Sequence, residues 1–71
     1  MNPKPIILFD IVILTEDLPD KKLRHGNIGT VIEILTSDVF LVEFVDSEGR
    51  TYAEEILKAN QLWKARYQLV A

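Results

Sequence analysis

The stretch that decides the fold is GNIGTV, residues 26–31, in which two glycines stand three positions apart before a β-branched pair. Glycine adopts positive φ without steric cost, so Gly26 and Gly29 predict a tight turn. The pair Thr30-Val31 then predicts the start of a strand, because β-branched residues favour extended backbone. We expect a turn that feeds the second strand of a small β-structure, with Gly29 in a conformation closed to other residues.

Alternating apolar and polar residues predict five strands in all, at 8–14, 29–35, 39–45, 50–57 and 62–63. A long polar loop at 16–28 separates the first two strands, and a single helical turn at 58–61 precedes the last. Good helix formers at 52–63 leave a helix as the alternative there, but the turn signal at Gly49 favours a strand. The pattern is typical of an all-β, five-stranded SH3-like barrel with a long first loop. We expect one domain over residues 1–71, with its core at about 8–63 and an extension at 64–71.

The central predicted strand, residues 39–45, indicates which side chains form the core. Phe40, Val42 and Phe44 alternate with Glu43, whose carboxylate should face water. A chain of 71 residues without cysteine has no disulfide or thiolate metal site to stabilise it. Its hydrophobic residues, 48% of the chain, must therefore supply the stability, alone or with a partner chain.

Apolar residues of the first strand exceed what so small a barrel can enclose. Val12 and Leu14 share one face, and Ile11 and Ile13 share the other. A small barrel has a single interior, so one of these two pairs must lie outside it or beneath the C-terminal tail.

The tail alternates apolar and polar residues from Trp63 through Tyr67 to Leu69, with the charges on one face. We predict that this segment pairs along a sheet edge, its own or a second subunit's, and covers Ile11 and Ile13. Trp63 alternatively closes the bottom of the barrel. Aromatic side chains supply large contact areas, so Trp63 and Tyr67 are also candidates for binding a partner.

The charge balance weighs against nucleic acid as the main partner. Eight Lys and Arg residues stand against eleven Asp and Glu residues, for a net charge of −3. The single basic cluster, Lys21, Lys22 and Arg24, contains no aromatic residue to stack on bases and follows three acidic residues. RNA or DNA binding through this loop is therefore the alternative hypothesis, and a protein that contacts the loop should present acidic groups.

The sequence offers no set of residues for catalysis, a cofactor or a metal ion. His25 is the only histidine, and we expect it to be a solvated turn residue, with a pH-dependent contact as the alternative. Ser37 and Ser47 lie in predicted turns without a nearby base. The carboxylates before the basic cluster lack the spacing of a calcium loop, and we expect Asp17 or Asp20 to cap a turn around Pro19.

Hydropathy gives an expectation about location. The longest apolar run here, residues 11–14, is far shorter than the ~20 residues that cross a bilayer. No apolar segment has the length and cleavage site of a secretory signal. We therefore expect a cytoplasmic protein without a membrane partner.

Several stretches together resemble a known family: VILTEDLP at 12–19, LRHGNIGTVIE at 23–33, VEFVD at 42–46 and GRT at 49–51. This is a family of small bacterial proteins catalogued as domain of unknown function forty-nine twenty-six. The resemblance covers residues 9–62 and implies a stand-alone SH3-like β-barrel. It brings no catalytic or ligand-binding residues with it.

The leading hypothesis is a non-catalytic protein-binding module, either an accessory subunit or the neutralising partner of another small protein. Its partner would be another protein or a second copy in a homodimer. The residues expected to make the contact are Ile11, Ile13, Lys21, Lys22, Arg24, Trp63, Tyr67 and Leu69.

Overall fold

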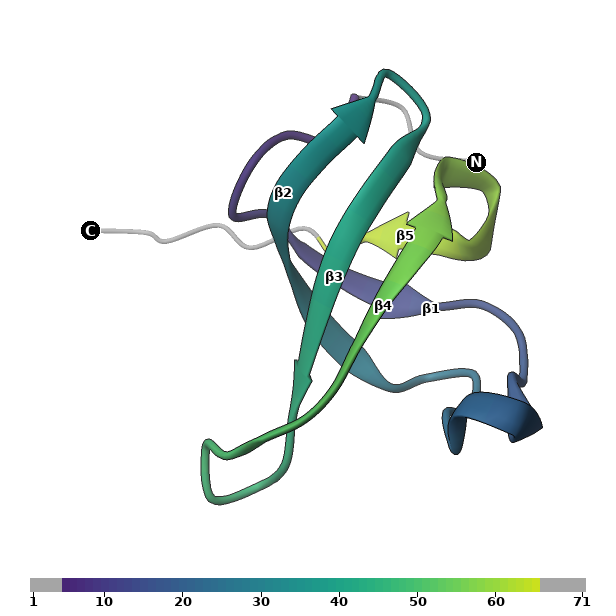
Figure 1. Ribbon diagram of the computed structural model, residues 1–71, viewed down its shortest axis with the longest axis vertical. Helices are drawn as coiled ribbons and strands as arrows, with labels where there is room; N and C mark the ends of the chain where they lie inside the picture. The colour runs from purple at the N-terminus through teal and green to yellow at the C-terminus, as the bar shows by residue number, and fades with distance from the viewer. Residues whose placement is uncertain (1–4, 66–71) are drawn as a thin grey trace.

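The computed structural model describes residues 5–65 and shows a five-stranded antiparallel sheet (Figure 1). Its strands are β1 (Ile11–Leu14), β2 (Ile28–Thr36), β3 (Val39–Val45), β4 (Thr51–Lys58) and β5 (Leu62–Lys64). Two single 3₁₀ turns interrupt them, η1 (Pro19–Lys21) in the first loop and η2 (Ala59–Gln61) before β5. The predicted all-β class, long first loop and helical turn before the last strand are confirmed. The helical alternative over 52–63 is wrong, because most of that segment is β4.

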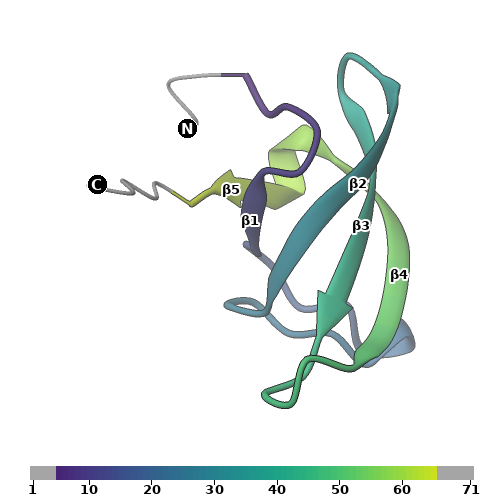
Figure 2. The ribbon, with the colours of Figure 1, turned by 90° about the vertical axis from the view of Figure 1, so that its left-hand side faces the viewer.

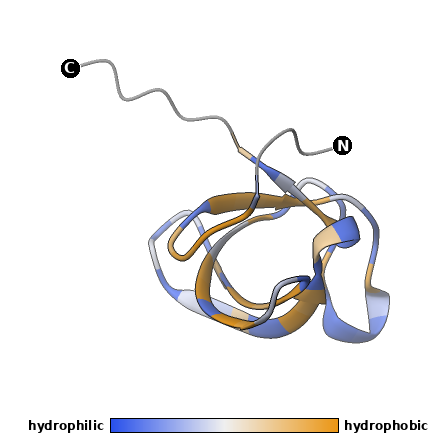
Figure 3. Cartoon of the chain, turned by 90° about the horizontal axis from the view of Figure 1, so that it is seen from above, coloured by the Kyte–Doolittle hydropathy of each residue, from blue (hydrophilic) through white to orange (hydrophobic). Residues whose placement is uncertain are grey.

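The strands are hydrogen-bonded in the order β4-β3-β2-β1-β5. Only η2 separates β4 from β5 in the chain, so the two edges of the sheet come close at that end and the sheet must curve. Figure 2 shows β1 and β5 on one side and β2 to β4 on the other, and Figure 3 shows the strands following a ring. Within residues 5–65 the ladder contains no β4–β5 pair, so closure into an SH3-like barrel stays a prediction.

The core lies inside this curved sheet, and the alternation in β3 identifies it correctly. Phe40, Val42 and Phe44 are each at most 1% exposed. The other buried hydrophobic residues are Val12, Leu14, Leu23, Val31, Leu57 and Leu62. Because Val12 and Leu14 are buried, Ile11 and Ile13 are the pair that lies outside the core. Ile11 and Ile13 are on the opposite side of β1 and are half-buried.

The first strand begins later than predicted, at Ile11 instead of residue 8. The reason is a turn at residues 7–10. The carboxylate of Asp10 accepts a hydrogen bond from the Ile7 N–H at 2.8 Å, and the Asp10 N–H donates to the Ile7 carbonyl at 3.1 Å. Between them Phe9 takes a φ of 70°, which extended backbone never has.

The prediction of a special backbone conformation at Gly29 is also wrong. Positive φ occurs at Gly26, with φ 91°, while Gly29 is an ordinary strand residue of β2. Gly29 is needed for space: a Cβ built there would lie 2.6 Å from Val42 Cγ1 and 2.9 Å from the Glu43 carbonyl oxygen. The close approach of β2 to β3 therefore explains this glycine.

Candidate functional site

A row of large apolar side chains crosses the outward side of the sheet. In the pairing register, Ile13 of β1 lies opposite Ile28 of β2 on one side and opposite Trp63 of β5 on the other. Neighbouring strands are about 4.8 Å apart, so these three side chains form one row. Ile28 is 51% exposed and Trp63 54% exposed, while Ile13 between them is half-buried.

Strand alternation explains why this row faces outward. Gly29 and Leu62 are buried, so their chain neighbours Ile28 and Trp63 must point the other way. The next row contains Ile11 opposite Thr30, which is equally uncharged. We call the residues Ile11, Ile13, Ile28, Thr30 and Trp63 the uncharged face.

The outward side of the other half of the sheet mixes carboxylates with apolar side chains, since Ile56 of β4 lies opposite Leu41 next to the glutamates. Glu43 of β3 lies opposite Glu54 of β4, and Glu33 of β2 lies opposite Leu41. Like charges directly opposite one another repel, and only water screens them well. One compensation is a hydrogen bond of 3.0 Å that the Thr51 hydroxyl donates to Glu43. We call Glu33, Glu43 and Glu54 the acidic face.

The turn at residues 7–10 presents a second group of exposed apolar side chains, of which Leu8 and Phe9 belong to the strand predicted at 8–14. Ile7 is 55% exposed, Leu8 43% and Phe9 68%. Ile28 was missed as well. Its position next to Gly29 was the available signal, because a glycine packed inward leaves its strand neighbour outward.

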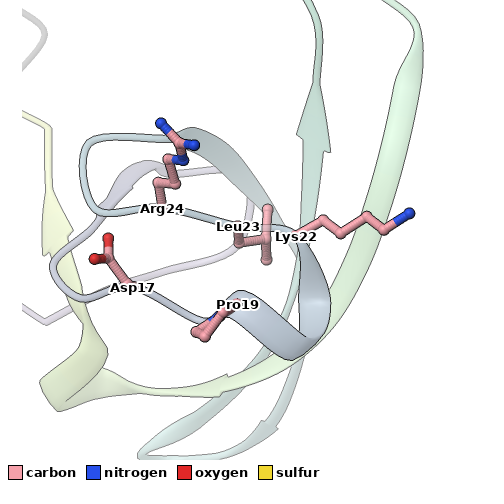
Figure 4. Close-up of a pocket in the computed structure, with 5 residues that line it drawn as sticks. All are labelled: Asp17, Pro19, Lys22, Leu23 and Arg24. Carbon is pink, nitrogen blue, oxygen red and sulfur yellow. The ribbon is translucent and has the colours of Figure 1, made fainter.

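The predicted basic cluster is not gathered into one patch. Lys21 Nζ lies 3.4 Å from the Glu55 carboxylate of β4, which offsets its charge. Lys22 and Arg24 line a shallow hollow of about 420 Å³ together with Asp17, Pro19 and Leu23. Figure 4 shows the Lys22 and Arg24 side chains pointing away from each other. Nucleic-acid binding through this loop stays a prediction.

The loop also contains an exposed acid–base contact. The Asp17 carboxylate accepts the backbone N–H of His25 at 3.0 Å and lies 2.8 Å from His25 Nδ1. These two hydrogen bonds, the backbone one first, lower the pKa of Asp17 below its ordinary value. His25 is exposed in a turn as expected, but Asp17 caps the turn at His25 and not one around Pro19, since η1 has no side-chain cap.

The structure thus separates the predicted contact residues. Ile11, Ile13 and Trp63 share the uncharged face, whereas the basic cluster belongs to the loop whose Lys21 contacts β4. Tyr67 and Leu69 lie outside the described residues, so the predicted covering of Ile11 and Ile13 stays a prediction. Up to its last described residue the tail does follow β1, because the Ala65 N–H donates to the Ile11 carbonyl at 2.8 Å.

Residues 5–65 also bear on metal binding and on the membrane. No group of three or more His, Asp or Glu side chains is placed there to hold a metal ion. In the same residues, no helix has the length and apolar character to cross a membrane.

Residues 8–64 match the family model described as Domain of unknown function (DUF4926). The chain belongs to this family. The match begins within the turn that carries Phe9 and ends with β5, so the uncharged face and the turn tip both lie in the DUF4926 domain. No curated protein and no solved structure matches the chain.

Proposed function

We propose that this chain is a non-catalytic protein-binding module, an accessory or neutralising partner of another protein, and that it binds through the uncharged face. The observation that carries the proposal is the row in which Trp63 and Ile28, both more than half exposed, flank Ile13. Soluble monomers rarely expose large apolar side chains side by side except where they make contacts. Tryptophan is also among the residues that contribute most to protein interfaces.

The charge distribution supports this choice of surface. The cores of protein interfaces are depleted of charged residues, because an unpaired charge loses its hydration on binding. The uncharged face meets this requirement over two rows of side chains. The acidic face does not, because Glu43 and Glu54 would be desolvated next to each other.

The backbone under the uncharged face is already ordered by the sheet. Ile13 is held between two strands by the β1–β2 and β1–β5 ladders, so little backbone entropy is lost when a partner binds. The indole N–H of Trp63 is a donor that a partner carbonyl can accept, which would orient the complex.

Matched lysine variants test the proposal. The affinity-tagged chain would be recovered from its native cells as wild type, as Ile28→Lys and as Ile56→Lys. Ile56 is 62% exposed on β4, so it controls for adding a lysine at an exposed strand position outside the uncharged face. Circular dichroism would check that both variants fold.

We expect wild type and Ile56→Lys to retain the same partner and Ile28→Lys to lose it, because a lysine in the row must be desolvated on binding. A wild-type chain that is always recovered alone and monomeric would refute the proposal. Equal recovery with both lysine variants would remove the uncharged face from the interface.

A further inference from the structure

Phe9 combines two unusual properties at the tip of the turn at residues 7–10. Its φ of 70° lies in the left-handed region, where a bulky L-residue is a genuine outlier. Its exposure of 68% is also the highest among the exposed large hydrophobic residues of the described chain.

Hydrogen bonds on both sides of Phe9 fix the turn to β2. The Phe9 N–H donates to the Val31 carbonyl at 2.7 Å, and the Val31 N–H donates to the Asp10 carbonyl at 2.9 Å. The strained residue is therefore clamped to the central part of a nine-residue strand.

The turn is also tied to the far end of the domain. The Asp10 carboxylate, which accepts the Ile7 N–H, lies 3.2 Å from Lys64 Nζ. Both side chains are largely buried, at 16% exposed for Asp10 and 24% for Lys64. Lys64 Nζ in turn donates to the Pro5 carbonyl at 3.2 Å, so the segment leading into the turn is held as well.

Packing among the described residues 5–65 does not account for Phe9. A ring that is mostly exposed gains little from its own domain, and glycine or asparagine would adopt the same φ with less strain. Strained backbone that is fixed by its surroundings tends to occur at binding sites. An aromatic ring held rigidly in water is suited to binding, because it loses little freedom when a partner covers it.

We infer that Phe9 is an anchor that inserts into an apolar pocket of a partner protein, with Ile7 and Leu8 at the rim of the contact. This inference rests on the proposed function and adds a second contact point to it. We take this partner to be a protein other than a second copy, because the hollow described above is a poor match for an apolar ring. The hollow beside the first loop has three charged residues, Asp17, Lys22 and Arg24, among its five lining residues and does not match a phenyl ring.

Photo-crosslinking in native cells tests the anchor directly. Phe9 would be replaced by the photoreactive analogue p-benzoylphenylalanine, and a control chain would carry the analogue at Ile56. We expect a crosslink from position 9 to one partner protein, at apolar side chains of a single pocket, and none to that protein from position 56.

Three other outcomes would contradict the anchor, the proposed function or both. A product of twice the chain mass of 8.1 kDa would show a second copy as the occupant and contradict the inference. A partner that is recovered with the wild-type chain but is not crosslinked at position 9 would overturn the anchor and leave the proposed function standing. Recovery of no partner with any chain would overturn both.

Phe9→Asn separates an anchor from a packing residue. Asparagine tolerates left-handed backbone, so the melting temperature should equal or exceed that of wild type. Partner affinity should fall at least about tenfold, as for a hot-spot side chain. The affinity of the control Ile56→Asn should stay within about twofold of wild type, as expected for a surface position outside an interface. A lower melting temperature for Phe9→Asn with unchanged affinity would show that the ring serves folding.

Discussion

The two halves of this sheet share one core but present opposite outward sides. In the row from Ile28 through Ile13 to Trp63 the side chains that point away from the core are apolar, and Thr30 in the next row is uncharged. On β3 and β4 the glutamates Glu43 and Glu54 lie directly opposite each other, next to the apolar pair of Leu41 and Ile56. Core packing does not explain the difference, since β1 and β3 both bury alternate residues.

The comparison shows that alternation in a strand fixes only which side chains point inward. The outward residues are free to suit their surroundings. Opposed carboxylates such as Glu43 and Glu54 are tolerable in water and costly in an interface, whereas an apolar row has the reverse preference. The row from Ile28 to Trp63 is therefore better suited to contact than the position of the two glutamates.

The largest expected effect concerns β2, the strand that belongs to both halves. Gly29→Val should lower the free energy of unfolding by about 3 kcal/mol, because the new side chain would collide with Val42 and with the backbone of Glu43. Urea denaturation measures the change. Gly26→Asn is the control, since no atom lies within 4 Å of a Cβ at Gly26 and asparagine tolerates its positive φ. An unchanged midpoint for Gly29→Val would contradict the close packing of β2 on β3.

A pair of aromatic truncations compares the two halves as binding surfaces. Trp63→Ala should weaken partner binding by about 2 kcal/mol or more, as expected for a hot spot. Tyr52→Ala, at a residue of β4 that is 47% exposed, should cost less than about 0.5 kcal/mol. Isothermal titration calorimetry with the recovered partner would measure both. Equal losses would erase the distinction between the two faces.

Glu43 allows the boundary between the faces to be tested from both sides, because it lies opposite Glu54 on β4 and opposite Thr30 on β2. Glu54→Lys should stabilise the fold by about 0.5 kcal/mol through a cross-strand ion pair, and salt should reduce the gain. Thr30→Lys should give a similar gain in thermal unfolding but weaken partner binding. If Thr30→Lys binds as wild type does, the uncharged face ends before Thr30.

The smallest expected effect belongs to a loop outside both faces. The backbone N–H groups of Arg50 and Glu48 donate to the Asp46 carboxylate and hold its pKa below the ordinary value near 3.8. Because the pKa of Asp46 is lower in the folded than in the unfolded chain, these hydrogen bonds stabilise the fold fully above the unfolded pKa. The stabilisation is lost as the pH falls through the folded pKa. Asp46→Asn should therefore lower stability at pH 7 and matter less near pH 3. Urea unfolding at both pH values measures this, and an equal loss at both would exclude the carboxylate charge as the cause.

Alternation predicted the core and most of the strands, because the local pattern contains that information. The strand predicted at residues 39–45 is β3 itself, with Phe40, Val42 and Phe44 inward. The pairing partners of β1 could not be predicted in the same way. Ile11 and Ile13 were recognised as surplus to the core, but only the register places Ile13 between Ile28 and Trp63.

The turn at residues 7–10 shows why the rest of the site was missed. Four consecutive apolar residues from Ile6 to Phe9 favour a strand by composition, and the turn depends on Asp10 meeting Lys64 from the other end of the domain. The prediction of a special backbone conformation at Gly29 was wrong for a similar reason. Sequence shows that a glycine is present, but whether it provides a positive φ or room for Val42 depends on the neighbouring strand.

Trp63 has one more consequence, because it is the only tryptophan of the chain. When tryptophan is excited selectively over the two tyrosines, the fluorescence therefore comes from the uncharged face alone, without any label. In the free domain, a dissolved quencher such as acrylamide should reach the half-exposed indole readily, and emission should be red-shifted as in water. A protein that covers the row next to Ile13 should shift the emission to the blue and shield it from the quencher. A ligand bound only at the first loop should leave the spectrum unchanged.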